Sequence, residues 1–324
     1  MVGYEGEQVD RACKVTLRWE GDAPFRLITS AHLSRPEHYL SIYQSGCNFA
    51  CKKCHSWYFT RHASGGWMSP KDIGVLARDY AKTITYWEPR QRATSFHAHD
   101  LCVSCGSCVT EKKRSSYCPG ALEPEQVILS AQGWGPARNI IAFTGGDLAC
   151  QPEFYCLASE EIKGPGKDLW VLFETNGYGL TPKNLDRFKA SGIDAFWLDI
   201  KAHDEAIHRR LTGCSNEQIL RLPYEIKKRD FVLEVLCLFI PGWVETDQIE
   251  KIARIISAVD PQIPFTILAF FPEYQLKDIP SPNLEQMLEA YKRVKDRGLK
   301  NVRLGNIGIF VRTEEEFELL RNLL

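Results

Sequence analysis

Short apolar runs alternate with amphipathic stretches along this chain from about residue 38 onward. The apolar runs are rich in β-branched and aromatic residues, and this alternation is typical of successive βα units, which predicts a parallel sheet. The expected strands are Tyr39–Gln44, Asn139–Phe143, Leu169–Phe173, Ala195–Ile200, Val232–Ile240, Phe265–Phe270 and Asn301–Leu304. Seven strands at this spacing are too many for a sandwich of hairpins, so we expect an α/β protein.

The amphipathic stretches predict helices between these strands. Ser69–Trp87 is the clearest, with Ser69 as its N-cap and Pro70 at its first helical position. Its apolar face comprises Ile73, Leu76, Tyr80, Ile84 and Trp87. The other expected helices are Thr181–Ser191, Asn216–Lys228, Thr246–Val259, Asn283–Arg297 and Thr313–Leu324. Right-handed crossovers curl such a series into a full or partial (β/α)6 barrel, whose reactive groups follow the strand C-termini.

Two segments do not fit the repeat. Residues 1–36 read as a hairpin, VTLRWEG followed by FRLITS, which we expect to pack outside the barrel. Residues 88–136 form a long polar insertion that contains cysteines. Because a structureless loop of that length is uncommon, we expect the insertion to fold around a group of its own. Residues 37–87 and 137–324 would then form the first and second parts of the barrel.

Composition excludes several function classes. The 324 residues include 40 Lys and Arg against 41 Asp and Glu, and the net charge is −1. No overall field therefore attracts polyanions or membranes, and a general nucleic-acid binder is not expected. The sequence shows no apolar run of transmembrane length, and its first residues lack the basic start and apolar stretch of a secretory signal. We expect a cytoplasmic protein.

Seven of the 12 cysteines lie in two short clusters, whereas a disulfide framework would spread them through the chain. The first cluster, Cys47, Cys51 and Cys54, has the spacing C-x3-C-x2-C and follows the first strand. Three thiolates can hold three irons of a [4Fe–4S] cluster, and the fourth iron is then open to substrate chemistry. The alternative is a zinc knuckle with His55 as fourth ligand, or simply buried thiols.

The three-cysteine loop resembles the signature of the radical S-adenosylmethionine (radical SAM) superfamily. Thr144–Asp147, TGGD, is similar to that family's Gly-Gly-Glu motif. Three further segments resemble one branch, the glycyl radical enzyme activases such as pyruvate formate-lyase activating enzyme. They are FETNG at Phe173–Gly177, LDIKAHDEAIHRRLTGCSNEQIL at Leu198–Leu220 and FIPGW at Phe239–Trp243. The resemblance implies a partial radical SAM barrel.

The resemblance also implies the cofactor site. The residues expected against S-adenosylmethionine are Lys53, His55, Gly145, Gly146, Asp147, Glu174, Thr175, Asn176, Asp199, Ile200 and Lys201. The glycines would let the amino acid end of the cofactor approach the backbone closely. Glu174, Thr175 and Asp199 would frame a monovalent cation beside its carboxylate. The alternative for these polar residues is that they form helix caps and loop hydrogen bonds.

The second cluster, Cys102, Cys105, Cys108 and Cys118, reads C-x2-C-x2-C-x9-C-P. Four thiolates can fill all corners of a second [4Fe–4S] cluster, which would serve electron transfer or stiffen the insertion. Zinc held by the four cysteines is the alternative. Many activases carry a ferredoxin-like domain here, although usually with two clusters. The remaining cysteines are expected as buried apolar residues: Cys13, Cys150, Cys156, Cys214 and Cys237.

The resemblance implies cleavage of S-adenosylmethionine to a 5′-deoxyadenosyl radical, which would abstract hydrogen from a glycine of a partner enzyme. It also implies an external flavodoxin or ferredoxin as electron donor, and an anaerobic setting. The alternatives are radical chemistry on a metabolite or another macromolecule, and a non-enzymatic iron–sulfur carrier or zinc-stabilised binding module. No acid–base pair is needed for the cleavage.

Four departures leave the hydrogen donor open. SAHLSRPEHYLSIY stands where the activases have DGPG-x-R, and AFFPEYQL, with Glu273, Tyr274 and Gln275, replaces a Tyr-His pair. Leu236, two residues after Glu234, corresponds to an arginine on the fifth strand. Residue 53, commonly aromatic in the activases, is Lys53.

Overall fold

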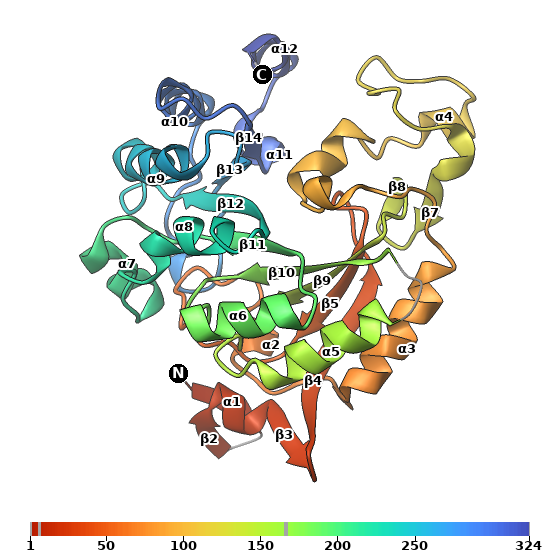
Figure 1. The fold of residues 1–324 in the computed structure, drawn as a ribbon. Helices are drawn as coiled ribbons and strands as arrows, with labels where there is room; N and C mark the ends of the chain where they lie inside the picture. Colours follow the sequence, from red (N-terminus) through yellow and green to blue (C-terminus); the bar gives the residue numbers. More distant parts are fainter. Residues whose placement is uncertain (1, 6–7, 165–167, 324) are drawn as a thin grey trace.

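The computed structural model describes residues 2–5, 8–164 and 168–323. Seven parallel strands lie side by side in chain order and curve into a partial barrel (Figure 1). They are β5 (Leu40–Gln44), β9 (Ile140–Gly145), β10 (Trp170–Thr175), β11 (Ala195–Asp199), β12 (Val232–Phe239), β13 (Phe265–Ala269) and β14 (Val302–Gly305). Each strand expected from the sequence is confirmed, with its ends within two residues of the expected ones.

The N-terminal segment extends this sheet. The expected hairpin forms as β3 (Leu17–Glu20) and β4 (Ala23–Leu33). However, β4 pairs antiparallel with β5 and also with β6 (Gly66–Met68), so the expectation that the hairpin packs outside the barrel is wrong. Pairing with β4 satisfies backbone groups of β5 that an edge strand would leave open. Before it come β1 (Val2–Glu5), β2 (Gln8–Arg11) and α1 (Ala12–Val15).

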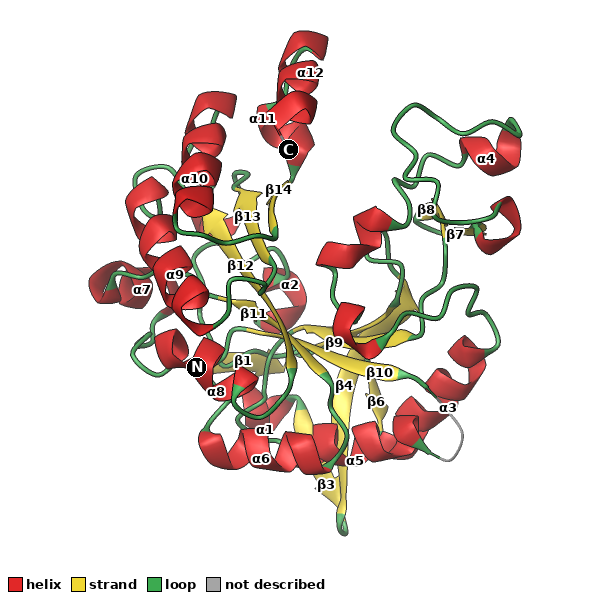
Figure 2. Cartoon of the chain, turned by 45° about the horizontal axis from the view of Figure 1, so that its top comes forward, coloured by secondary structure: helices red, strands yellow, loops and turns green. Residues whose placement is uncertain are grey.

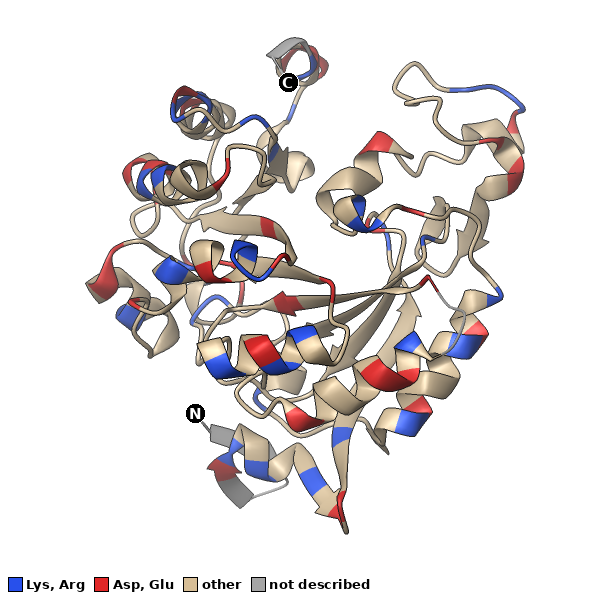
Figure 3. Cartoon of the chain, viewed as in Figure 1, with Lys and Arg blue, Asp and Glu red and all other residues tan. Residues whose placement is uncertain are grey.

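Helices cover the outer face of the sheet, and their solvent side carries most of the charged residues (Figures 2 and 3). The longer helices are α3 (Pro70–Ala81), α5 (Glu153–Lys163), α6 (Pro182–Ala190), α9 (Thr246–Val259), α10 (Leu284–Asp296) and α12 (Glu314–Leu323). The shorter helices are α2 (Trp57–Thr60), α4 (Ser107–Thr110), α7 (Glu205–Thr212), α8 (Leu222–Lys227) and α11 (Ile307–Phe310). No helix in the described parts of the chain combines the length and apolar character needed to cross a bilayer.

Two expected helices are shorter than the sequence pattern suggested. α3 begins at the expected cap, where Ser69 and Asp72 form a capping box, but it ends at Ala81, so the expectation for Ile84 and Trp87 is wrong. Thr85 and the residue after it donate backbone hydrogen bonds to Ala137, which draws the chain out of the helix. In the second case, only Leu222–Lys227 of the expected 216–228 segment is α-helical, preceded by a 3₁₀ turn at Ile219–Arg221.

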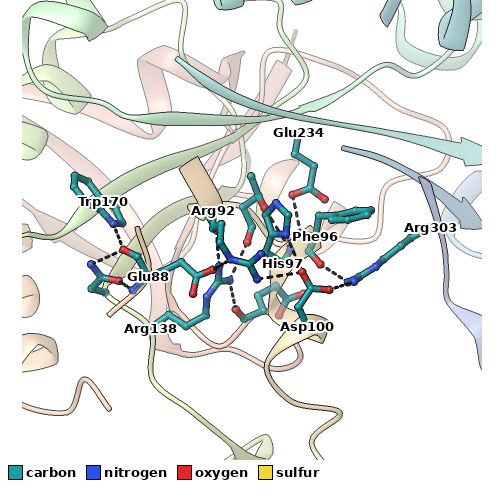
Figure 4. Close-up of polar contacts among 12 residues, drawn as sticks. Glu88, Arg92, Phe96, His97, Asp100, Arg138, Trp170, Glu234 and Arg303 are labelled. Carbon is teal, nitrogen blue, oxygen red and sulfur yellow. Dashed lines mark hydrogen bonds and ion pairs between the residues drawn. The ribbon is translucent and has the colours of Figure 1, made fainter. Parts of the chain in front are cut away.

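The insertion, residues 88–136, attaches where the barrel strands begin (Figure 4). The Glu88 backbone N–H donates to the Asn139 side chain at 2.7 Å, and Trp170 Nε1 donates to the Glu88 carbonyl at 2.6 Å. Arg303, on β14, donates to the Phe96 carbonyl and pairs with the Asp100 carboxylate. These contacts tie one segment to the first residues of several strands.

Part of the insertion also fills the barrel at the N-terminal ends of its strands, which we call the lower barrel. Ala93 is fully buried in an apolar cluster with Tyr39, Ile140, Ala142, Leu172 and Ala195. The Phe96 backbone N–H donates to Glu234 Oε2 at 3.0 Å (Figure 4). Glu234 lies on the side of β12 that faces the barrel interior. The insertion therefore closes the end of the barrel opposite the strand C-termini.

Candidate active site

The three-cysteine loop leaves the C-terminal end of β5 and is fixed to its surroundings by the backbone. Its hydrogen bonds run from Asn48 N to Asp147 O (2.8 Å), Ala50 N to Thr212 O (2.9 Å), Lys52 N to Leu211 O (2.8 Å) and Gln275 N to Lys52 O (3.1 Å). These partners lie after β9, at the end of α7 and after β13. Three separate segments thus position one short loop at the mouth of the barrel.

A cavity opens beside this loop, at the strand C-termini. It is lined by Cys47, Cys51, Thr144, Gly145, Asp147, Glu174, Thr175, Asn176, Trp197, Asp199, Lys201 and Leu236. The structure therefore brings most of the residues expected from the sequence into one site. Cys54, Gly146, Lys53, His55 and Ile200 are not among the lining residues. Ile200 is fully buried in the core.

Asp147 links two of the segments that form the site. Its buried carboxylate accepts hydrogen bonds from Ala149 N (2.9 Å), Thr175 Oγ1 (2.8 Å) and Asn176 N (2.9 Å). Burial raises the pKa of this carboxyl group, while the three donors act in the opposite direction. Asp147 therefore joins the end of β9 to the end of β10.

Asn176 connects β10 to the cysteine loop. Its Nδ2 donates to Asn48 Oδ1 at 2.6 Å and lies 3.6 Å from Cys47 Sγ. Its Oδ1 accepts from the backbone N–H of Tyr178 at 3.0 Å. The side chain thus acts as a brace, which is the loop hydrogen-bonding role left open from the sequence.

Gly145 and Gly146 are required by close packing as well as by any ligand. Gly145 has φ of +82°, and a Cβ on Gly146 would lie 2.0 Å from the carbonyl oxygen of Gly46. Gly146 N donates to Gln44 O at 2.8 Å. Only glycine lets the turn after β9 pass this close to the backbone that leads into the three-cysteine loop.

Two polar atoms of residues that line the cavity have no partner among the described residues. Asp199 pairs with Lys201 through Oδ2, but Asp199 Oδ1 and Trp197 Nε1 are buried without a hydrogen bond in this part of the chain. Buried polar atoms are normally hydrogen-bonded, so an unsatisfied donor and acceptor at one cavity indicate a polar ligand. The cysteines, bare glycines and unpaired polar atoms fit a thiolate-held cluster with an amino acid group bound beside it.

Glu174 lines the cavity from the side of β10 that faces the barrel interior. Oε1 accepts from the Tyr39 hydroxyl at 2.9 Å, and Oε2 accepts from Thr144 Oγ1. Burial raises the pKa of Glu174 to about 8, partly opposed by these hydrogen bonds, and the Glu37 carboxylate adds to the rise. The expected cation beside Glu174 and Thr175 stays a prediction, since Thr175 Oγ1 donates to Asp147.

Lys53 and His55 lie on the other side of the loop. Lys53 Nζ sits 3.5 Å from the centroid of the Phe271 ring. His55 is largely exposed and faces Glu273, with Nδ1 3.6 Å from Oε2. The run that replaces the Tyr-His pair thus packs directly against the cysteine loop.

Three cavity residues were not predicted: Thr144 within the TGGD motif, Trp197 and Leu236. Trp197 precedes Asp199 by two positions on β11, and side chains two apart on a strand share a face. That alternation was the available signal for Trp197.

The second group of cysteines also meets at one place. Cys102, Cys105, Cys108 and Cys118 all line a small pocket in the insertion. Gly106 has φ of +75°, and a Cβ there would lie 2.2 Å from the Trp134 ring. Within the described residues, no three Cys, His, Asp or Glu side chains are grouped so as to hold a single metal ion.

The family model of the radical SAM superfamily matches residues 102–256, from the second cysteine cluster into α9. Over these residues, just under half of its length, the chain is similar to the radical SAM superfamily. The match begins beyond the three-cysteine loop, so the loop is a separate feature that does not contribute to this similarity. The fold is consistent with this similarity, since its parallel strands form a partial barrel.

Two curated relatives of this chain come from Methanocaldococcus jannaschii. One is named "Putative glycyl-radical enzyme activating enzyme" and is 32% identical over 166 residues, 50% of this chain and 61% of that protein. The other, named "Uncharacterized protein", is 28% identical over 137 residues, 41% of this chain and 39% of that protein. Each match spans less than two thirds of the relative.

Among solved structures, Streptococcus suis SuiB bound to precursor peptide SuiA superposes with a TM-score of 0.52. It is 13% identical, and the match covers 90% of this chain and 52% of SuiB. At this identity the likeness concerns the fold alone.

Proposed function

We propose that this protein cleaves S-adenosylmethionine at a [4Fe–4S] cluster held by Cys47, Cys51 and Cys54, and installs a glycyl radical on a partner enzyme. When bound, the reduced cluster and S-adenosylmethionine supply a 5′-deoxyadenosyl radical that can abstract hydrogen from an unactivated C–H bond. Every other contribution comes from residues of the chain.

These residues bind, orient and shield. Three thiolates fix the cluster, and the Gly145–Gly146 turn leaves room for an amino acid group. The unpaired Asp199 Oδ1 and Trp197 Nε1 offer an acceptor and a donor to the cofactor. The insertion closes the lower barrel with Phe96 and Ala93, which excludes water from beneath the site.

One observation carries the proposal. Cys47 and Cys51 line the same cavity as these two unpartnered polar atoms, at the C-terminal ends of parallel strands. In barrels of this kind, the strand C-termini are where reactive groups gather.

Anaerobic reconstitution, reduction and measurement of 5′-deoxyadenosine test the cleavage. We expect turnover in the unchanged protein and none in Cys47→Ala, Cys51→Ala or Cys54→Ala. The matched control is Cys237→Ala, because Cys237 is fully buried within β12 and does not line the cavity. Metal binding without turnover in the unchanged protein would favour an electron carrier or a zinc-stabilised module.

The glycyl radical step rests on the similarity to the activating-enzyme relative and on the FETNG, LDIK and FIPGW segments. Incubation with a candidate glycyl radical enzyme should give a protein-centred doublet in the EPR spectrum. The missing DGPG-x-R segment supports a second candidate, chemistry on a metabolite or another macromolecule. That candidate predicts 5′-deoxyadenosine formation without the doublet.

We further propose that Cys102, Cys105, Cys108 and Cys118 hold an auxiliary [4Fe–4S] cluster for electron transfer or for stiffening of the insertion, with zinc as the alternative. A flavodoxin or ferredoxin would supply electrons in an anaerobic cytoplasm. The shared pocket of the four cysteines supports the ligand set. Iron, sulfide and zinc analysis distinguishes the two metals.

A further inference from the structure

Lys53 carries an ammonium group without a polar partner beside the three-cysteine loop. Lys53 as a whole is 8% exposed, and its Nζ is buried with no hydrogen-bond acceptor among the described residues. Nζ lies 3.5 Å from the centroid of the Phe271 ring and 5.7 Å from that of Phe270. The charge is therefore enclosed by aromatic rings.

The nearby charged groups do not form an ion pair with Lys53. The Glu273 carboxylate acts on the ammonium more strongly than any other charge, but it pairs with His55 instead, with Oε2 3.6 Å from His55 Nδ1. Asp199 pairs with Lys201, and Lys201 adds a second positive charge that acts on Lys53. In the described part of the chain, no ion pair involves the Lys53 ammonium.

Such an arrangement is unfavourable without a further negative group. Burying an unpaired ion is costly, and a cation–π contact offsets only part of that cost. Lys53 lies between Cys51 and Cys54 in the sequence, and the Cys54 sulfur is among the groups acting on its ammonium. Thiolates bound to a metal cluster would supply the missing negative charge at this place.

Resting on the proposed function, we propose that Lys53 is the counter-charge of the cluster held by Cys47, Cys51 and Cys54 and raises its reduction potential. The cluster gains one negative charge when it accepts an electron from a low-potential one-electron donor. A fixed positive charge nearby therefore stabilises the reduced form more than the oxidised form. Lys53 is a positioning residue in this scheme, because it acts through the cluster.

The test is an EPR-monitored redox titration of the anaerobically reconstituted full chain, following the signal that changes when S-adenosylmethionine is added. The variants are Lys53→Met, Lys53→Gln and Lys53→Arg. Lys52→Met is the matched control, because Lys52 is the adjacent lysine and its Nζ lies 6.0 Å from the Trp243 ring centroid. Iron content is measured for each variant.

At a fixed solution potential, we expect the ratio of reduced to oxidised cluster to fall about tenfold in Lys53→Met and Lys53→Gln, a shift of roughly 59 mV for one electron. Lys53→Arg should restore the ratio, and Lys52→Met should leave it unchanged. If neither neutral variant retains the cluster while Lys53→Arg does, the counter-charge role is also supported.

An unchanged ratio in the neutral variants would overturn the inference, as would an equal shift or equal loss of iron in Lys53→Arg. An equal shift in Lys52→Met would do the same, because it would show a general charge effect. Failure of the unchanged protein to bind the cluster would instead overturn the proposed function, so the two failures are distinguishable.

Discussion

The side-chain amide of Asn176 donates to Asn48 Oδ1 at 2.6 Å and joins the end of β10 to the three-cysteine loop. The two residues are far apart in the sequence, yet their contact lies beside Cys47, whose sulfur is 3.6 Å from the same amide nitrogen. The position of a cysteine therefore depends on a residue of the FETNG segment.

Removing this brace should loosen the loop. We expect Asn176→Ala to lower the iron bound per chain and to reduce the free energy of unfolding by about 1–3 kcal/mol, because a buried acceptor loses its donor. Iron analysis and urea unfolding measure both effects. The control is Asn301→Ala, whose side chain donates to Gln262 O at an exposed position. Full iron content in Asn176→Ala would contradict the bracing role.

The Gly145–Gly146 turn should not accept a side chain. A Cβ on Gly146 would lie 2.0 Å from Gly46 O, whereas a Cβ on Gly308 would meet nothing within 4 Å. Gly146→Ala should therefore destabilise the fold by about 1–3 kcal/mol and reduce cluster loading, because the turn must move away from the cysteine loop. Gly308→Ala should change neither quantity. Equal stability of the two variants would show that the turn is not tightly packed.

Glu174 should make stability depend on pH. Burial raises its pKa to about 8, against an ordinary value of roughly 4.3. The pKa of such a carboxyl group is higher in the folded than in the unfolded state. Its contribution to stability is complete below the unfolded-state pKa and is lost as the pH rises through the folded-state pKa. The loss should therefore occur between about pH 4 and pH 8.

Glu174→Gln removes this titration while keeping the shape of the side chain. Its free energy of unfolding relative to the unchanged protein should rise between about pH 5.5 and 7.5, by up to about 3 kcal/mol. Urea unfolding at the two pH values checks this. Glu160 on α5 is exposed, and Glu160→Gln is the matched control. A pH-independent difference for Glu174→Gln would contradict the raised pKa.

The insertion cysteines should bind iron separately from the first loop. Cys105→Ala should lower the iron content from about eight to about four atoms per chain, because a second [4Fe–4S] cluster would lose a corner. Cleavage of S-adenosylmethionine should decrease less than in Cys51→Ala, since the two groups occupy opposite ends of the barrel. Cys156→Ala, a buried cysteine of α5, serves as control. Zinc in place of the second set of irons would contradict the auxiliary cluster.

Sequence pattern predicted the parallel strands and the chain segments that meet at the site, because both depend on local signals. Alternating apolar runs mark strands, and residues that follow parallel strands gather at one edge. Asp147, Thr175 and Asp199 could be placed in this way. α5 was not predicted, although its buried face, with Phe154, Ala158 and Ile162, has helical spacing.

Features that depend on distant partners could not be predicted. The end of α3 is set by hydrogen bonds to Ala137, and the position of the insertion depends on contacts such as Arg303 with Asp100. The N-terminal hairpin joins the sheet because β5 would otherwise be an edge strand. The local sequence pattern of each of these segments does not indicate which distant residues it will contact.

The EPR spectrum of the reduced, reconstituted protein with and without S-adenosylmethionine tests the central claim most directly. The account predicts an iron–sulfur signal that changes when S-adenosylmethionine is added, and loss of that change in Cys51→Ala. A first loop filled by zinc, or a cluster signal that S-adenosylmethionine leaves unaltered, would contradict it.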